Sequence, residues 1–269
     1  MKCIVSARRP LQNIFNMQQV LAAFIFFTRL PFWRLAEVPK EYYQRVVNYW
    51  SLTGWLTAGC TAIVLYAGVL FLPASVALLF ALLTRLLITG CLHEDGLADF
   101  MDGFGGGASR ERILAIMKDS HIGTYGVIGL IFYFALLYAL LSSLPFELAG
   151  CAILAGDPFS KSVSSMIINR LPYARTEEQA KNKTIYSRMS GKEYIISLFF
   201  GLIPLLWLPD LIYIGAIFLP LIVWYLLTSF MKKKIQGYTG DCCGALFLLC
   251  ELSFYVGIVI IHSSSIFNH

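Results

Sequence analysis

Seven apolar stretches, each about as long as a helix that crosses a bilayer, constrain this chain more than any other feature of its sequence. Such a helix needs about 20 apolar residues. Hydrophobic residues make up 58% of the chain and charged residues only 14%, whereas soluble domains carry about 25% charged residues. The sequence therefore predicts an all-α, polytopic membrane protein, a bundle of about seven transmembrane helices. The predicted spans are residues 52–72, 74–91, 122–144, 146–169, 193–209, 210–230 and 243–262.

The chain divides into two parts. Residues 1–16 form an N-terminal extension in which we find no pattern, and residues 17–269 are predicted to form one integral-membrane domain. The apolar run that starts at Met17 is too short to span a bilayer, and Pro31 disfavours helix in the residue before it. We therefore predict a short interfacial or re-entrant helix within residues 17–33.

The basic residues predict the orientation of the chain in the membrane. Nineteen of the 21 Lys and Arg residues fall before the first span or in the loops 92–121, 170–192 and 231–242, whereas the other connectors carry none. Because basic loops stay inside, the N-terminus and these three loops are predicted to be cytoplasmic in the cell inner membrane. An odd number of spans then places His269 on the periplasmic side. The net charge of +5 thus indicates orientation and not nucleic-acid binding.

Three aspartates in the first of these loops form the main candidate site. Asp95, Asp99 and Asp102 lie at i, i+4 and i+7, so in a helix they fall within about 60° of one another. Carboxylates so placed repel one another unless a cation neutralises them, and Mg²⁺ prefers oxygen ligands and bridges phosphate oxygens. The sequence predicts that they bind Mg²⁺ and act on a phosphate-containing substrate. The alternative is a solvated acidic face.

Residues around the aspartates are candidates for contact with an anionic substrate. Residues 105–107 are predicted to form a glycine loop that leads to a helix capped by Ser109, and free N–H groups at a helix start can hold an anion. Arg110 and Lys118 supply cations beside this loop. His93 is either a hydrogen-bonded interface residue or a catalytic group.

Arg85, Asp157 and Lys161 fall inside predicted spans, where charges are costly and commonly functional. Asp157 and Lys161 are four residues apart on one helix, so they either pair with each other or serve a substrate. Arg85 is expected to face the bundle interior and to pair with an acid or a substrate phosphate. Asp241, at the start of the last span, is either a helix cap or a site residue.

Five short motifs occur along the chain in a fixed order. They are FFTRLP (26–31), HEDGLADFMDGFGGG (93–107), IMKDSHIGTYG (116–126), LPYAR (171–175) and GYTGD (237–241). With these motifs the chain resembles the cobalamin synthase family, the adenosylcobinamide-GDP ribazoletransferases. Two places depart from the family's pattern, because Lys161 stands where an Arg is expected and residues 176–183 are more polar than the expected glycine-rich stretch.

The resemblance implies a reaction in the last steps of cobalamin biosynthesis. Adenosylcobinamide-GDP reacts with α-ribazole, or with its 5′-phosphate, to give adenosylcobalamin, or its 5′-phosphate, and GMP. A ribose hydroxyl attacks the phosphorus on the corrinoid side chain, and Mg²⁺ is the implied cofactor. The sequence leaves open which lower-ligand base the enzyme prefers in its nucleoside substrate, whether the phosphorylated form is preferred, and whether the protein is a homo-oligomer.

With this reaction in view, each candidate residue has a hypothetical role. Asp95, Asp99 and Asp102 hold one or two Mg²⁺ ions, and one of them or His93 removes the proton from the ribose hydroxyl. The cations stabilise phosphate charge, and the remaining acids hold the nucleoside or complete the metal shell. The predicted substrate-binding residues are Arg85, Arg110, Lys118, Asp119, Lys161, Arg175 and Asp241.

Two other functions are alternatives. A CDP-alcohol phosphotransferase also uses glycine-spaced aspartates at a cytoplasmic membrane face, but the second half of its motif is missing here. A membrane transporter would use Asp157, Lys161 and Arg85 as a site in mid-membrane. The polar loops lie on one side, which argues against a transporter, because a transporter needs access from both sides.

Overall fold

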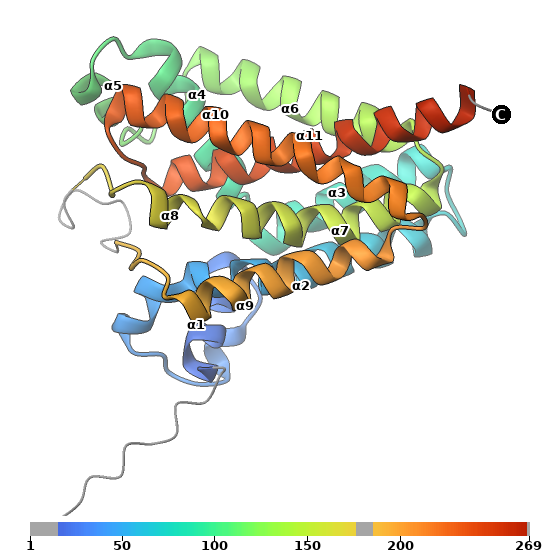
Figure 1. Cartoon of the computed structure of the whole chain (residues 1–269), viewed down its shortest axis with the longest axis horizontal. Coiled ribbons are helices and arrows are strands. Elements are labelled where there is room, and N and C mark those ends of the chain that lie inside the picture. Colours follow the sequence, from blue (N-terminus) through green and yellow to red (C-terminus); the bar gives the residue numbers. More distant parts are fainter. Residues whose placement is uncertain (1–15, 176–184, 268–269) are drawn as a thin grey trace, which may run out of the picture.

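A computed structural model describes residues 16–175 and 185–267, shown as the coloured ribbon in Figure 1. Helices and one isolated β-bridge make up the ordered elements of these residues, and no β-strand occurs among them. The prediction of an all-α protein is therefore confirmed. Residues 1–15, most of the predicted N-terminal extension, and the polar stretch 176–183 lie outside the described residues.

Most of the described helices overlap the predicted spans, and α4 and α5 lie in the predicted loop 92–121. They are α1 (Met17–Phe27), η1 (Phe32–Arg34), η2 (Lys40–Tyr49), α2 (Trp50–Gly68), α3 (Ala74–Thr89), α4 (Leu92–Gly106), α5 (Arg110–Ile116), α6 (Thr124–Ser142), α7 (Phe146–Ser165), α8 (Ile167–Arg170), α9 (Gly191–Leu202), η4 (Ile203–Trp207), η5 (Leu211–Ile217), α10 (Phe218–Ile235) and α11 (Gly240–Phe267).

Within the described part of the chain, four helical segments are long and apolar enough to cross a membrane. A fifth is present if α3 and α4, which are bent by 88° relative to each other, are counted as one span. A polytopic membrane protein follows from these segments, whereas the count of seven spans stays a prediction. The four segments are Lys40–Gly68, Thr124–Ser142, Leu211–Ile235 and Gly240–Ser265.

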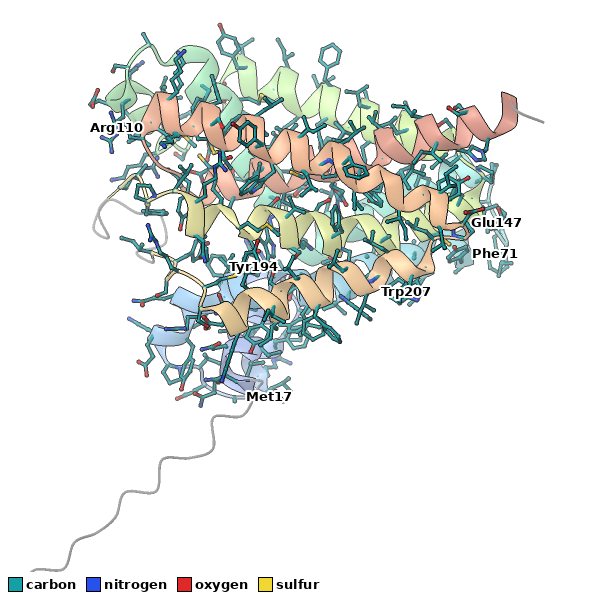
Figure 2. All side chains as sticks on the ribbon, viewed as in Figure 1. Met17, Phe71, Arg110, Glu147, Tyr194 and Trp207 are labelled. Atoms are coloured by element: carbon teal, nitrogen blue, oxygen red, sulfur yellow. The ribbon has the colours of Figure 1, made fainter. Side chains whose placement is uncertain are left out.

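The two ends of the bundle differ in what they carry. Helices α1, α5 and α8 lie at one end, on the left of Figure 1, and the C-terminal end of α11 lies at the other. Figure 2 places Arg110 at the first end and Phe71 and Glu147 at the second. The described parts of the long polar loops therefore gather at one end, as the charge pattern predicts. Which side of the membrane this end faces stays a prediction.

Helix α7 lies inside the bundle, packed against α2, α9 and α11. From Leu148 to Ser165 its residues are buried, except Cys151 and Leu154, which are half-buried. Small residues allow this close packing, as is common between membrane helices. A Cβ atom on Gly54 of α2 would lie only 2.8 Å from the Cα atom of Pro158.

A sharp turn between α3 and α4 places the acidic segment at the polar end of the bundle. Gly90 (φ +63°) and Cys91 (φ +57°) are both in the left-handed region, which glycine adopts without steric cost. Arg29 packs against this turn. Its N–H donates to the carbonyl oxygen of Ile88 at 2.7 Å, and a Cβ atom on Gly90 would overlap its side chain. The N-terminal segment therefore holds the turn from which α4 begins.

Candidate active site at the polar end of the bundle

The three predicted aspartates lie on one helix, α4, but have different surroundings. Asp95 is exposed, Asp99 is half-buried and Asp102 is buried. No group of three or more His, Cys, Asp or Glu side chains is placed to hold a metal ion in the described ranges. The joint metal role of the three aspartates stays a prediction.

Asp102 binds the start of α6. Its Oδ2 accepts a hydrogen bond from the N–H of Gly123 at 2.7 Å, and its Oδ1 accepts one from the N–H of Gly126 at 2.8 Å. A carboxylate is favoured here because the first N–H groups of a helix lack partners and carry partial positive charge. Cβ atoms on the two glycines would come within 2.5 and 2.4 Å of this carboxylate, which explains the glycines at both positions.

Asp102→Asn is expected to destabilise the protein by about 1–3 kcal/mol, because the amide can accept only one of the two hydrogen bonds and turns an NH₂ group toward the other N–H. Thermal unfolding in detergent measures the change. Glu111→Gln, which alters an exposed carboxylate on α5, is the control and should leave the melting temperature unchanged. Equal melting temperatures for all three proteins would contradict a capping role.

The glycine run that follows is not the predicted loop. Helix α4 continues through Gly106, so the prediction of a loop at 105–107 is wrong for its first two residues. Packing explains Gly105, because a Cβ atom there would lie 2.6 Å from the ring of Tyr125. The predicted cap of the next helix is confirmed, since the Ser109 hydroxyl accepts a hydrogen bond from the N–H of Arg112 at 3.2 Å.

A pocket opens where α1, α2, α4 and α11 meet the loop around Tyr173 and the segment around Tyr186. Four of the predicted site residues line it: His93, Asp95, Arg175 and Asp241. The other lining residues are mostly aromatic or small, namely Phe26, Phe27, Val47, Trp50, Leu92, Tyr173, Tyr186, Gly240, Cys243 and Gly244. This pocket is the candidate active site.

Two loops that are far apart in sequence form one wall of the pocket. Tyr173 and Tyr238 make a parallel β-bridge, in which the N–H of Ala174 donates to the carbonyl oxygen of Tyr238 at 2.8 Å. The N–H of Tyr238 donates in turn to the carbonyl oxygen of Pro172 at 3.0 Å. The LPYAR and GYTGD motifs are therefore a single structural unit, which places Arg175 and Asp241 side by side.

Two of the predicted phosphate-binding arginines fix these loops. Arg110 donates to the carbonyl oxygens of Ile235 (3.0 Å) and Ala174 (2.8 Å). Arg175 donates to the carbonyl oxygen of Leu114 at 2.8 Å, and its guanidinium lies 3.9 Å from the Asp241 carboxylate. Arg175 lines the pocket and Arg110 does not. Arg110 therefore supports the loop from behind, whereas Arg175 can also contact a bound molecule.

The tyrosines of the pocket remain protonated at physiological pH. Burial raises the pKa of Tyr173 to about 12, and burial also raises the pKa of Tyr186 well above its ordinary value. Neutral phenols donate hydrogen bonds and present apolar ring faces. Tyr173 and Tyr186 can therefore contact both a ring system and a polar group of a bound molecule.

His93 is held by packing. Its ring lies 4.9 Å from that of Phe247, 5.5 Å from that of Trp50 and 6.1 Å from that of Phe27. Its Nε2 atom is buried and has no hydrogen-bond partner among the described residues. Its backbone is also close to α11, because a Cβ atom on Gly244 would lie 3.1 Å from the His93 carbonyl oxygen. Its place in the pocket wall permits ligand contact, and its catalytic role stays a prediction.

Arg85 faces the bundle interior, as predicted. Its guanidinium lies 2.6 Å from the Glu251 carboxylate and 3.5 Å from that of Glu94, and donates to the Tyr133 hydroxyl at 2.6 Å. Tyr255 completes the cluster by donating to Glu251 at 2.9 Å. Arg85 does not line the pocket. It joins α3 to α4, α6 and α11 and thereby positions the helix that carries Asp95.

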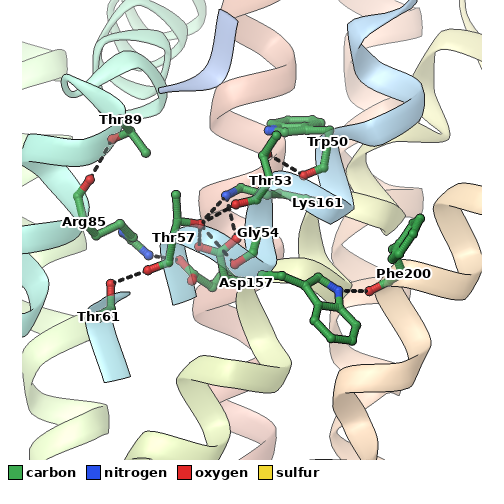
Figure 3. A network of polar contacts seen from close by, with 12 residues as sticks. Trp50, Thr53, Gly54, Thr57, Thr61, Arg85, Thr89, Asp157, Lys161 and Phe200 are labelled. Atoms are coloured by element: carbon green, nitrogen blue, oxygen red, sulfur yellow. Dashed lines mark hydrogen bonds and ion pairs between the residues drawn. The ribbon is translucent and has the colours of Figure 1, made fainter. Parts of the chain in front are cut away.

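Lys161 forms a second buried ion pair, shown in Figure 3. Its ammonium lies 2.6 Å from the Asp157 carboxylate and donates to the Thr57 hydroxyl at 2.8 Å, and this hydroxyl donates to Asp157 at 2.7 Å. Of the two alternatives left by the sequence, the structure shows that Asp157 and Lys161 pair with each other. Both side chains are buried and neither lines the pocket.

The last two predicted substrate-binding residues lie outside the pocket. Lys118 and Asp119 are exposed in the connection from α5 to α6. Asp119 accepts hydrogen bonds from the side chain (2.7 Å) and backbone N–H (3.1 Å) of His121, and these bonds lower its pKa. Contact between these residues and a substrate stays a prediction.

The aromatic lining of the pocket was not identified from the sequence. Phe26 and Phe27 end the short helix predicted to lie at the membrane interface, Trp50 begins α2, and Tyr186 lies in the segment before α9. The FFTRLP motif was the available signal, since it contains both phenylalanines. The structure places the end of α1 in the wall of the candidate active site.

Comparison with known proteins identifies the family. The chain matches the sequence profile of the cobalamin-5-phosphate synthases over residues 19–259. The chain belongs to the cobalamin-5-phosphate synthase family. The resemblance found in the motifs is thereby confirmed, and the match includes all five of them. No solved structure shows significant similarity to the chain.

Individual members of the cobalamin-5-phosphate synthase family align with most of this chain, and those described here are named adenosylcobinamide-GDP ribazoletransferase. The protein from Leptospira interrogans is 35% identical over 251 residues, which are 89% of this chain and 94% of the relative. The protein from Shewanella sp. (strain W3-18-1) is 36% identical over 90% of this chain and 94% of its own. The protein from Shewanella frigidimarina is 36% identical over 88% and 92%.

Proposed function

We propose that this protein is an adenosylcobinamide-GDP ribazoletransferase, the activity for which its relatives are named. One observation carries the assignment. Four of the five family motifs contribute side chains to one pocket, and the fifth, IMKDSHIGTYG, holds α4 through Asp102. The residues that each of the four motifs supplies are Phe26 and Phe27, His93 and Asp95, Tyr173 and Arg175, and Gly240 and Asp241.

The reaction joins a nucleoside to a corrinoid through phosphorus. A ribose hydroxyl oxygen of α-ribazole, or of its 5′-phosphate, bonds to the phosphorus on the side chain of adenosylcobinamide-GDP. The bond from that phosphorus to the oxygen of the neighbouring phosphate breaks, and GMP leaves with this oxygen. The hydroxyl proton must go to a base. Positioning and charge stabilisation supply most of the catalysis in such transfers.

The pocket offers side chains for these tasks. Asp95 is the one aspartate of the α4 face that lines the pocket, and it is exposed, so it can accept the hydroxyl proton. Arg175 is held by its bond to Leu114, and its guanidinium is placed to stabilise phosphate charge. Asp241, beside Arg175, is placed to orient this guanidinium or to bind the ribose hydroxyls.

The carboxylates that line the pocket fit Mg²⁺, but they are not the three aspartates predicted from the spacing in α4. Mg²⁺ in phosphoryl-transfer sites is commonly bound by one or two carboxylates, with substrate phosphates and water completing its shell. Asp95 and Asp241 both line the pocket, whereas Asp102 is bound to two amides. We assign the ion to Asp95 and Asp241, with Asp99 one helical turn from Asp95. Bound there, Mg²⁺ would neutralise charge on the diphosphate.

The proposed location is the cell inner membrane with the pocket facing the cytoplasm. The gathering of basic loops at the end that holds the pocket supports this orientation, since such loops are retained inside. The C-terminal end of α11 is then periplasmic. The substrates would reach the pocket from the cytoplasm without crossing the membrane.

The test uses the purified full chain in lipid nanodiscs with adenosylcobinamide-GDP, α-ribazole and Mg²⁺. Equimolar GMP and adenosylcobalamin, identified by chromatography and mass, are expected. A chelator should stop the reaction and added Mg²⁺ restore it. Activity unchanged by the chelator would contradict the Mg²⁺ assignment alone. Absence of GMP, together with CMP release from CDP-diacylglycerol and an alcohol, would contradict the proposed function and support the lipid-enzyme alternative.

A further inference from the structure

The pocket has a continuous aromatic lining that the reaction chemistry does not use. The ring of Tyr186 meets that of Phe26 edge-on at 6.3 Å, and Phe26 meets Phe27 at 5.0 Å. Phe27 stacks on Trp50 with ring centres 5.2 Å apart and planes 12° apart, and Trp50 continues to His93. This row of five rings, Tyr186, Phe26, Phe27, Trp50 and His93, is called the aromatic wall below. All five residues line the pocket.

The same pocket also holds charged groups. Asp95, Arg175 and Asp241 line it together with the aromatic wall. A nucleoside has both chemistries, because its base is a planar ring system that stacks on aromatic side chains and its ribose carries hydroxyl groups. A pocket lined by both kinds of residue therefore suits one nucleoside, with its base against the rings and its ribose near the charged groups.

We propose that the aromatic wall binds the base of α-ribazole; this inference rests on the proposed function and names the substrate part that occupies the wall. The bond path supports this choice over guanine. In α-ribazole one ribose separates the base from the attacking oxygen. In adenosylcobinamide-GDP a ribose and a further phosphate separate guanine from the reacting phosphorus. The nucleoside whose base lies next to Asp95 is therefore the attacking one.

The polarity of the wall supports the same choice. Guanine presents several donors and acceptors on its edge, and a site that selects it must pair them. The base of α-ribazole is a benzimidazole, mostly carbon with one free ring nitrogen. In the wall, Trp50 Nε1 and His93 Nε2 are buried without partners among the described residues. Neither atom is exposed to the pocket, so the wall presents mainly ring faces to a bound base, which suits a base with few polar atoms on its edge better than guanine.

The test separates the two substrates kinetically. Phe26→Leu keeps an apolar side chain but removes the ring. Base–aromatic stacking is commonly worth about 5- to 100-fold in affinity, so the KM for α-ribazole should rise by about 10-fold or more. The KM for adenosylcobinamide-GDP should change by less than about 2-fold. Phe26→Tyr, which keeps the ring, should stay near the wild-type KM. Binding of α-ribazole alone, measured by calorimetry in detergent, should weaken in parallel.

The matched control is Phe24→Leu, on the same helix. The Phe24 ring packs against Phe32 at 5.0 Å and does not line the pocket, so both KM values should stay at their wild-type levels. An unchanged KM for α-ribazole in Phe26→Leu, or a rise confined to adenosylcobinamide-GDP, would overturn the inference while leaving the transferase assignment intact. A wild-type protein that forms no GMP would instead overturn the proposed function.

Discussion

Asp95→Asn is expected to lower kcat for GMP formation by about 10²- to 10⁴-fold, the range typical for loss of a general base or of a group that stabilises developing charge. Asp95 is the exposed aspartate of α4 that lines the pocket, and in the proposed mechanism it accepts the proton and holds Mg²⁺. Because its carboxylate is exposed, the protein should unfold at the wild-type temperature. Initial rates and thermal unfolding, measured on the same preparation, test both statements.

Asp95→Asn and Asp102→Asn should therefore fail in different ways. The first loses turnover and keeps stability, whereas the second loses stability because it breaks the cap of α6. Glu147→Gln, an exposed carboxylate at the opposite end of the bundle, is the control and should keep both (Figure 2). Near-normal turnover in Asp95→Asn would remove Asp95 from the mechanism and leave the predicted role of this helix without support.

Lys161→Met is expected to cost about 3–5 kcal/mol of stability, the usual result of removing one partner of a buried ion pair. Asp157 would keep only the hydrogen bond from Thr57 and would otherwise be an unpaired carboxylate inside the bundle. A fall in melting temperature in detergent, with a lower yield of folded protein, measures this effect. The double variant Asp157→Asn with Lys161→Met, which removes both charges, should recover much of the loss.

A substrate role for Lys161 predicts a different outcome. In that case the double variant would regain stability but not turnover, and the KM of one substrate would rise. With a structural role, turnover per folded molecule should stay within about 2-fold of the wild-type rate. Lys232→Met, which removes an exposed lysine near the end of α10, serves as the control. An unchanged melting temperature in Lys161→Met would contradict the buried pair.

Helical periodicity predicted which residues share a face, but not what lies opposite that face. The spacing of Asp95 and Asp102 correctly indicated one helix, α4. The partners of Asp102, however, are the N–H groups of Gly123 and Gly126, more than 20 residues later. Nothing in the spacing within α4 distinguishes a carboxylate that caps another helix from one that binds a metal ion.

The charges inside the spans show the same limit. The sequence indicated that Arg85 faces the interior, because a charge exposed to lipid is costly. Its nearest acidic partner, Glu251, is 166 residues away along the chain, so only the folded bundle brings the two together. For Asp157 and Lys161 the partners are one helical turn apart, and their pairing was accordingly one of the two alternatives foreseen.

The aromatic wall could not be predicted from the sequence for another reason. In a membrane protein a phenylalanine beside a span has the same sequence context whether it faces lipid, another helix or a pocket. Phe26, Trp50 and Tyr186 come from three separate segments, and only their packing shows that they share a cavity. The polar pocket residues were easier to find, because a polar group near a membrane requires an explanation.

The buried position of α7 has a consequence for how the chain enters the membrane during its synthesis. Insertion favours helices that are themselves hydrophobic, and an Asp or a Lys at the centre of a helix each opposes it by about 2.5–3.5 kcal/mol. The partner that Asp157 and Lys161 share outside α7, Thr57, is on α2, which is made earlier. The covering faces of α9 and α11 are made later. As the span predicted at residues 146–169, α7 would therefore insert beside α2, which is already made, and its second face would stay open to lipid until α11 is synthesised.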